Sequence, residues 1–350
     1  MTLAARPPVR IGVVGNDVPR QLVSACGAVP LRLVGSWVPE AVAELPTDLG
    51  AVDFVVADLF RTLTGPGADT PHGVIVCNDS QAHLRLFYLL RARGHGIPVH
   101  LLDLPRQDSA ASRVFATQQV HALIAFCAAL TGAPPTQDTL VKAATDEIRL
   151  GAALERMRSR RRAGVCSGGD ALTAYRVASR LTVDEALPMV DELHSPATDT
   201  GIRVHVSGST HPDATVYRLL ESRGLRIVSD DHDTGDRGNL GVGVVSPEVD
   251  VVIEGLTAAH LGRIGSTSVE LAQARAELTA SMAANAGADV VVSMIRSSDE
   301  AALWDVPDLR ECLHEIGVPL HVVSHLEPHN VVERIHELAD SVVAEGVRTP

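Results

Sequence analysis

Two aspartates occupy matching places in distant parts of this 350-residue chain. Asp79 follows the apolar residues 73–77, and Asp299 follows the apolar residues 290–295; in each case a helical pattern comes next. A carboxylate placed there can transfer protons to a ligand. It can equally cap the following helix, a role that contributes roughly 1 kcal/mol. The recurrence favours a site, although a duplicated ancestor would also have duplicated its caps.

Other polar and glycine residues lie in equivalent turns, where strands are expected to end. The candidate catalytic residues are Ser36, Asn78, Asp79, Ser298 and Asp299. The candidate substrate-binding residues are Gly15, Gly208, Ser209, His232 and Arg237. The two glycines would allow a backbone to approach a ligand closely. Because the carboxyl ends of parallel strands share one edge of a sheet, we expect these turns to line a common site.

Residues 230–243, DDHDTGDRGNLGVG, form a loop rich in aspartate and glycine. Its carboxylates could form the charged rim of a cleft or bind a hard metal ion. We favour a solvated acidic turn over metal binding. Arg237 could pair with one of these carboxylates or receive an anionic substrate.

Three further groups of residues are candidate ligand sites. His325, Glu327 and His329 lie within five residues, but without the spacing of a helical metal motif; we favour surface histidines. The arginine-rich residues 156–162 could hold phosphates. We favour instead a solvated helix end, where the positive charges offset the helix dipole. The five cysteines form no CxxC pair, so no metal site is predicted.

The elements that must position these residues follow one plan twice. Residues 73–105 and 289–328 each show a strand, a polar turn with aspartate, a helix, a Gly-Ile/Val-Pro sequence and a second strand. Residues 10–35 similarly resemble residues 203–230. This duplication predicts an α/β fold of two related, doubly wound parallel-sheet lobes that face each other across a cleft.

The predicted domains are an N-terminal α/β lobe (1–108), a helical middle segment (109–195) and a C-terminal α/β lobe (196–350). The first lobe should contain strands near Ile11, Leu31, Phe54, Val74 and Val99. The middle segment has room for four helices, with N-caps at Thr136 and Thr182 and a helix end at Gly132. Residues 195–201 are the expected boundary before the second lobe.

Composition excludes several classes of protein. A formal charge of −13 disfavours nucleic-acid binding, and aromatic residues, at 3% of the chain, offer no stacking surface for bases. No uninterrupted apolar run reaches the roughly 18 residues of a membrane span. Residues 1–10 lack the apolar core of a secretory signal. We therefore expect a cytoplasmic protein with a small-molecule substrate and neither a membrane nor a nucleic-acid partner.

The order of several segments resembles one family over nearly the whole chain. These are VPRQLVSACGAVPLRLVG, VIVCNDS with LDLPR, CSGGDAL, SGSTHPDATVYRLLESRGLRIVSDDHDTGDRG and the stretch from ARAELTAS to SHLEP. They resemble the catalytic subunits of 2-hydroxyacyl-CoA dehydratases, which are related to benzoyl-CoA reductase subunits. The resemblance implies an ATP-driven activator, an iron–sulfur cluster between the lobes, and reduction of a thioester to a ketyl radical that expels its hydroxyl.

The chain departs from this family at the cluster ligands. The resemblance implies Cys-Asp dipeptides, yet Asn78 precedes Asp79 and Ser298 precedes Asp299. Amide and hydroxyl oxygens do not replace soft thiolates on iron–sulfur clusters. We therefore expect no cofactor in this chain and, by resemblance, a cluster in a partner. If the chain is an enzyme, it is a lyase (dehydratase) subunit that acts in a complex.

Two functions fit this pattern. The first, which we favour, is a cluster-less subunit that binds an acyl thioester or closes the active site of a homologous cysteine-bearing partner; a homo-oligomer is the alternative assembly. The second is a repurposed two-lobe protein that binds a small polar or anionic ligand and performs acid–base or metal-assisted chemistry. With less weight, two facing α/β lobes also describe nucleotide-sugar transferases and small-molecule receptors.

Overall fold

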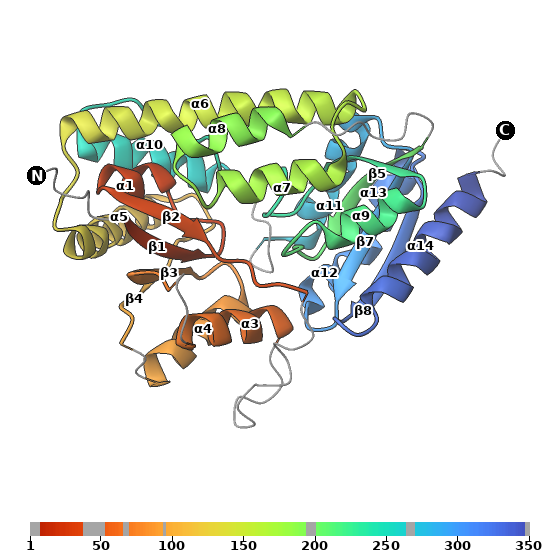
Figure 1. The fold of residues 1–350 in the computed structure, drawn as a ribbon, viewed down its shortest axis with the longest axis horizontal. Helices are drawn as coiled ribbons and strands as arrows, with labels where there is room; N and C mark the ends of the chain where they lie inside the picture. Colours follow the sequence, from red (N-terminus) through yellow and green to blue (C-terminus); the bar gives the residue numbers. More distant parts are fainter. Residues whose placement is uncertain are drawn as a thin grey trace, which may run out of the picture.

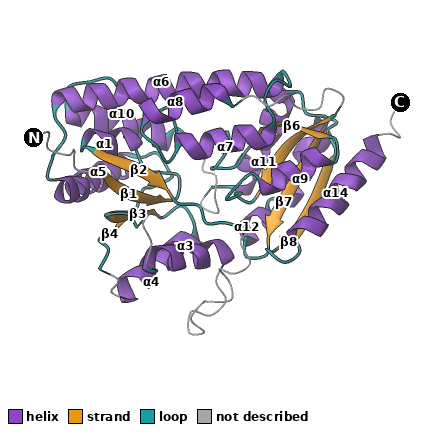
Figure 2. Ribbon diagram, viewed as in Figure 1, coloured by secondary structure: helices purple, strands orange, loops and turns teal. Residues whose placement is uncertain are grey.

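The structure is a computed structural model in which residues 8–37, 53–65, 70–93, 96–193, 201–263 and 270–346 are described. Two parallel sheets lie at opposite ends of the molecule, with a layer of long helices above both (Figure 1). Helices flank each sheet on both faces (Figure 2). The predicted fold of two doubly wound lobes is therefore confirmed. Most of the expected boundary at 195–201 lies outside the described residues.

The two sheets have the same strand order, which is the clearest sign of duplication. Lobe 1 is built on the order β2-β1-β3-β4 and lobe 2 on the order β6-β5-β7-β8, with all pairs parallel. The strands of lobe 1 are β1 (Val9–Val14), β2 (Ala28–Arg32), β3 (Gly73–Cys77) and β4 (Val99–Leu102). Those of lobe 2 are β5 (Ile202–Gly208), β6 (Leu225–Asp230), β7 (Val290–Arg296) and β8 (Leu320–Leu326).

Strand residues in lobe 1 alternate between two apolar layers, because successive side chains point to opposite faces of a sheet. Val74 and Val76 pack in one layer, whereas Ile75 and Cys77 pack in the other. Burial on both faces explains why these strands read as continuous apolar runs. The first layer is covered by α3 (Phe54–Thr64) and α4 (Gln81–Arg93), and the second by α1 (Arg20–Ala25) and helices from later in the chain.

The predicted strand near Phe54 is wrong, because residues 54–64 form helix α3. The side chain of Asp53 accepts a hydrogen bond from the backbone N–H of Val55 at 2.7 Å and caps this helix. The β-branched run at Val55 and Val56 suggested a strand. In the structure, residues 54–60 are nevertheless helical and all buried, so the apolar run belongs to a helix that is buried nearly all round in its first two turns.

The middle segment contains the four predicted helices: α5 (Ala110–Thr131), α6 (Gln137–Arg162), α7 (Gly168–Ala178) and α8 (Val183–Glu192). Thr136 and Thr182 form the predicted N-caps, each within a capping box. Gly132 ends α5 in a left-handed conformation, with φ of 76°. Helix α6 reaches from lobe 1 to lobe 2 along the top of the molecule (Figure 1).

Lobe 2 is covered by α9 (Thr215–Ser222), α11 (Ala272–Ala286), α12 (Glu300–Trp304), α13 (Val306–Glu315) and α14 (Val331–Gly346). One helix from this part of the sequence behaves differently. Helix α10 (Val249–Leu261) packs against α5 and α6 beside lobe 1. Its residues Val252, Ile253 and Leu256 join the same apolar layer as Ile11 and Ile75. The range 196–350 thus supplies a helix to the first lobe as well as building the second.

Helix α5 is long and apolar enough to cross a membrane by length and composition alone. Its buried residues, Ala116, Val120, Leu123 and Cys127, follow helical spacing and pack in the core of lobe 1. This is the arrangement of a helix that covers a sheet. A single helix of this kind is weak evidence for a membrane protein.

Candidate functional site

A cleft of about 440 Å³ lies between the two lobes. It is lined by the turns that follow three strands of each sheet, so the carboxyl edges of both sheets face the same space. Of the predicted residues, Gly15, Gly208, Ser298 and Asp299 line it. Asp79 lies directly behind the lining residues Gly15 and His83.

Asp79 is buried and does not cap the helix that follows it. One of its carboxylate oxygens accepts a hydrogen bond from the backbone N–H of Asn16 at 2.6 Å. The other lies 2.5 Å from Nδ1 of His83. The capping role belongs to Ser80, whose hydroxyl accepts the backbone N–H of His83. Asp79 therefore fixes the imidazole of His83, one turn along α4, at the edge of the cleft.

His83 combines the properties of a general acid or base. Burial by itself lowers its pKa, but the nearby carboxylate of Asp79 outweighs this effect, and Asp233 adds to it, so the pKa is raised above the usual 6.5. His83 lines the cleft, and within the described ranges its Nε2 has no hydrogen-bond partner. A carboxylate–histidine pair with one free ring nitrogen can exchange a proton with a bound ligand.

Asp299 is the lobe 2 counterpart of Asp79, and it too makes no capping hydrogen bond. Its carboxylate accepts a hydrogen bond from Ser209 Oγ at 2.7 Å. Ser209 in turn accepts the backbone N–H of Arg296 at 3.0 Å. In both lobes, therefore, the aspartate after the third strand ties down the turn after the first strand.

Gly15 and Gly208 are also equivalent, with φ of 97° and 100°. A Cβ atom at Gly15 would lie 2.6 Å from Cys77 Cβ, and one at Gly208 would lie 2.5 Å from the carbonyl oxygen of Met294. Glycine is therefore needed for close packing against the neighbouring strand. This packing accounts for both glycines whether or not a ligand approaches them.

Two ion pairs join the lobes beside the cleft. Nη2 of Arg32, from β2, lies 2.7 Å from a carboxylate oxygen of Asp233, which follows β6. Arg296 from β7 lies 3.6 Å from Asp53 and donates to the carbonyl oxygen of Thr210 at 2.6 Å. Burial raises the pKa of Asp233, but Arg32 and the hydroxyl of Thr210 outweigh it and bring the pKa to about 2. Asp233 is therefore ionised at neutral pH.

The interpretation of residues 230–243 as a solvated acidic turn is wrong. Asp230, Asp231, His232 and Asp233 are all at least 92% buried, with exposures of 0%, 8%, 2% and 5%. Asp230 pairs with Arg161 at 3.0 Å. The loop then runs along α6, where the backbone N–H of Gly241 donates to Glu147 at 3.0 Å. The loop connects the lobes and carries their buried charges.

The remaining predicted residues do not line the cleft. His232 is buried between Tyr217 and Thr234, at 2.6 and 3.1 Å. Asn78 faces β4, where its amide donates to Asp103. Arg237 contributes its carbonyl oxygen to Asn16, and Ser36 is half-buried in the segment after β2. Sequence reasoning overlooked His83, although the spacing of four residues from Asp79 was the available signal.

The arginine-rich end of α6 is solvated only in part, because Arg156 and Arg162 are exposed and the other arginines are not. Arg161 is 1% exposed and contacts Asp230 and Asp236. Arg158 donates to the hydroxyl of Tyr175 at 2.7 Å. The remaining arginines contact surface acids or a backbone carbonyl group: Arg156, Arg160 and Arg162. This end of α6 therefore docks the helix on lobe 2.

The part of the chain that the structure describes contains no group of three or more His, Cys, Asp or Glu side chains arranged to hold a metal ion. His325 is instead 2.9 Å from Ser324, and His329 pairs with Glu327 at 3.2 Å. All five cysteines fall in the described ranges, and none of them lines the cleft. Because iron–sulfur clusters need thiolate ligands, the donors around the cleft do not fit one.

Cys77 lies behind the lining residue Gly15, but its thiol packs in the core of lobe 1 with an exposure of 0%. Burial raises the pKa of this thiol, and the carboxylates of Asp79 and Asp17 raise it further. The thiol therefore stays protonated. Cys26 and Cys127 lie in the same core layer, Cys166 packs with α6 to α8, and Cys312 lies on α13.

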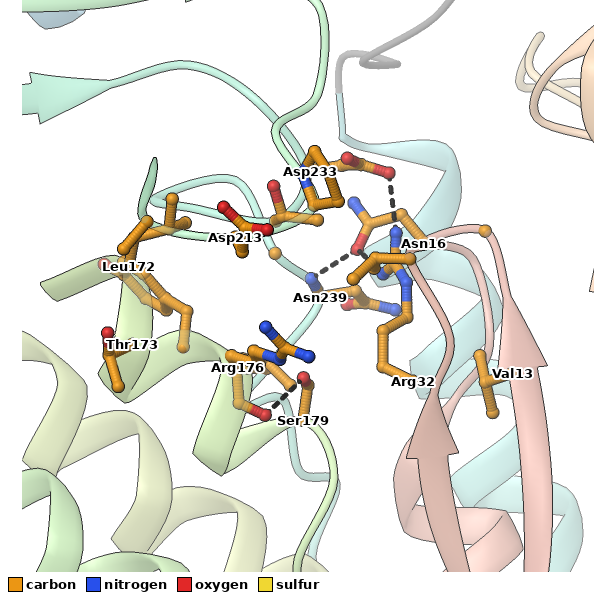
Figure 3. Close-up of a pocket in the computed structure, with 18 of the residues that line it drawn as sticks. Val13, Asn16, Arg32, Leu172, Thr173, Arg176, Ser179, Asp213, Asp233 and Asn239 are labelled. Carbon is orange, nitrogen blue, oxygen red and sulfur yellow. Dashed lines mark hydrogen bonds and ion pairs between the residues drawn. The ribbon is translucent and has the colours of Figure 1, made fainter. Parts of the chain in front are cut away.

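A second cavity of about 270 Å³ lies on the other side of the Arg32–Asp233 pair (Figure 3). Both cavities are lined by Gly15, Arg32, Val34 and Asp233, so this ion pair forms part of their common wall. Helices α7 and α9 supply the opposite wall.

A family model for the 2-hydroxyglutaryl-CoA dehydratase D-component matches residues 16–327 of the chain. The match runs from the turn after β1 to the residue that follows β8, and therefore includes the cleft and most of both lobes. No curated protein matches the chain. On the extent of the match, together with two facing lobes of identical strand order, this chain belongs to the 2-hydroxyglutaryl-CoA dehydratase D-component family.

Proposed function

We propose that this chain is a subunit of a 2-hydroxyacyl-CoA dehydratase-like complex that has no iron–sulfur cluster of its own. It binds an acyl thioester, or it closes the active site of a cysteine-bearing homologue. The observation that carries the proposal is a cleft at the carboxyl edges of both sheets whose lining, in the described ranges, contains no thiol. Family membership supports the dehydratase-like subunit.

The lining of the cleft suits a ligand with both polar and apolar parts. Val55, Leu59 and Trp304 supply apolar surface, while Arg296 supplies positive charge. Ser298 lies at the exposed rim, and its hydroxyl has no hydrogen-bond partner within the described part of the chain. Ser298 is thus the predicted residue best placed to donate to a thioester carbonyl oxygen, because the amide of Asn78 is engaged by β4.

The proposed partners follow from the function of the complex. The cluster that this chain lacks would be supplied by a homologous subunit, and electrons by an ATP-dependent activator. We place the complex in the cytoplasm, where free cysteines stay reduced. In such a complex the chain acts as part of a lyase, whose radical chemistry takes place on the partner's cluster.

Anaerobic purification of the chain, alone and with the products of neighbouring genes, tests this proposal. We expect the isolated chain to be colourless, without iron or sulfide, and a brown iron-containing homologue to co-purify with it. The complex should bind a 2-hydroxyacyl-CoA more tightly than free coenzyme A. Stoichiometric iron and sulfide in the isolated chain would overturn the proposal, as would failure to associate with any cysteine-bearing homologue.

The Asp79–His83 pair favours a second candidate function. In that function, the chain alone binds a small polar or anionic ligand, and His83 acts as its general acid or base. Activity without a partner, reduced about 10²–10⁴-fold by His83→Gln, is the expected outcome. His121→Gln is the matched control, because His121 is exposed on α5 and lines none of the cavities described here. Equal activity in the two variants would reject this function.

A further inference from the structure

The second cavity contains an excess of positive charge in a protein of formal charge −13. Four arginines and two aspartates line it: Arg20, Arg32, Arg176, Arg218, Asp213 and Asp233. Two of the arginines are neutralised, since Arg20 lies 3.1 Å from Glu147 and Arg32 lies 2.7 Å from Asp233. The other two arginines are Arg176 and Arg218.

Arg176 on α7 and Arg218 on α9 form no ion pair and no side-chain hydrogen bond within the described part of the chain. Arg176 extends from α7 toward Asn16 and Arg32 on the opposite wall (Figure 3). Asp213 is the nearest acidic counterpart in the cavity, and one of its oxygens already accepts the backbone N–H of Thr215 at 2.8 Å. Both arginines are exposed, so water solvates their guanidinium groups, and with Asp213 as the one lining carboxylate left they carry a net positive charge that an anion can neutralise.

The cavity also has apolar lining residues. Val13 and Val18 contribute from lobe 1, Leu172 from α7, and Leu240 from the loop that joins the lobes. Both side-chain amides are engaged: Oδ1 of Asn16 accepts the backbone N–H of Asn239 at 2.8 Å, and Nδ2 of Asn239 donates to the carbonyl oxygen of Val18 at 3.4 Å. A ligand would thus meet guanidinium groups and aliphatic side chains in the same cavity.

We propose that this cavity binds a small monocarboxylate with a short aliphatic chain. A carboxylate matches the planar fork of a guanidinium group. The volume is that of about nine water molecules, enough for an acid of a few carbon atoms. Asp213 and Asp233 in the wall disfavour a doubly charged phosphate, which also lacks an apolar part to fill the cavity. The site is independent of the function proposed for the cleft.

Calorimetry and methyl NMR on the full-length chain test this site with acetate, propionate, butyrate and inorganic phosphate. Affinity should rise about fourfold for each added methylene group, because each buries apolar surface. Butyrate should shift the methyl resonances of Val18, Leu172 and Leu240 and leave those of Val55 and Leu59 in the cleft unchanged. Inorganic phosphate should bind more weakly than butyrate.

The double variant Arg176→Gln/Arg218→Gln should weaken butyrate binding by about tenfold or more, since it removes charge-assisted hydrogen bonds. Arg310→Gln is the matched control, because Arg310 is exposed on α13, lines neither cavity and has no ion pair in the described part of the chain. The proposal is overturned by a lack of butyrate binding, by unchanged affinity in the double variant, by phosphate binding as tightly, or by methyl shifts in the cleft.

Discussion

At the scale of single residues, this chain places charges in its interior and pairs several of them with a charge from a distant segment. Arg161 from the middle segment meets Asp230 and Asp236 from lobe 2, and Arg32 from lobe 1 meets Asp233. A buried charge without a partner is costly, so each of these residues depends on the others. The aspartates look like a solvated loop in the sequence because their partners lie more than 60 residues away.

Loss of the Arg161 guanidinium should strongly destabilise the protein. Arg161→Leu leaves the buried carboxylate of Asp230 without its cation and leaves Asp236 with Arg158 alone, and we expect the free energy of unfolding to fall by about 3–5 kcal/mol. Arg156→Leu is the control, since Arg156 and Asp191 are 55% and 43% exposed, and such pairs contribute about 0–1 kcal/mol. Urea unfolding followed by circular dichroism measures both; similar losses would contradict the prediction.

The raised pKa of His83 gives stability a defined pH dependence. The folded protein binds this proton more tightly than the unfolded chain does, because of Asp79. The stabilisation is therefore complete below the unfolded pKa near 6.5 and is lost as the pH rises through the folded pKa.

Unfolding of the wild type and of His83→Gln across pH should reveal this effect. The difference in unfolding free energy should be larger near pH 5.5 than near pH 9, since the two values bracket the histidine pKa. In NMR titration, Asp79→Asn should lower the pKa of His83. A pH-independent difference in stability, or an unchanged titration in Asp79→Asn, would show that the pair does not hold a proton.

At the scale of elements, α6 and the loop that follows β6 hold the two lobes in place. The loop crosses from lobe 2 to lobe 1 in contact with α6, and Gly241 meets Gly151 backbone to backbone. Two glycines are needed at this crossing because a Cβ at Gly241 would lie 2.4 Å from Gly151 Cα. The glycines of this loop therefore permit close packing of two backbones.

Alanine substitution at two glycines should separate backbone strain from steric overlap. Gly132 and Gly241 both have φ of 76°, but no atom lies within 4 Å of a Cβ at Gly132. Gly132→Ala should cost about 1–2 kcal/mol from the left-handed conformation alone. Gly241→Ala should cost a further 1–3 kcal/mol or so from overpacking. Thermal and urea unfolding measure both variants, and equal losses would mean that the crossing tolerates a methyl group.

At the scale of the whole molecule, lobe 1 is not assembled from one stretch of sequence. Its sheet comes from residues 9–102, but one apolar face is covered by α5, α6 and α10, and α10 follows two strands of lobe 2. A single core layer also includes residues of both lobes. Trp37 of lobe 1 stacks on His211 of lobe 2, with their ring centroids 6.2 Å apart. The lobes are therefore interdependent.

A fragment of residues 1–108 should consequently fail to fold on its own. Without α5, α6 and α10 it would expose the face that carries Ile11, Ile75 and Leu102, a large apolar surface. We expect aggregation or poor chemical-shift dispersion in NMR, whereas the full chain gives a dispersed spectrum. A soluble fragment with cooperative unfolding would show that the lobe is autonomous.

Much of the fold could be predicted from the sequence, because local patterns determined it. Strands buried on both faces appear as apolar runs, Thr136 and Thr182 mark helix starts, and the repeated order of elements gave two lobes of the same topology. The strand predicted near Phe54 is wrong. Its β-branched residues suit strands, but here they lie in a buried helix that begins after the N-cap Asp53. These features depend on residues close together in the chain.

The site depended on contacts that no local pattern encodes. The sequence by itself determined the two sheets, the turns at their carboxyl edges and the absence of cysteines next to Asp79 and Asp299. Only the tertiary structure decided that Asp79 holds His83, that Asn78 turns toward β4, and that the acidic loop is buried against arginines. The physical reason is that the cost of a buried charge is offset only by a partner in space, whatever its distance in sequence.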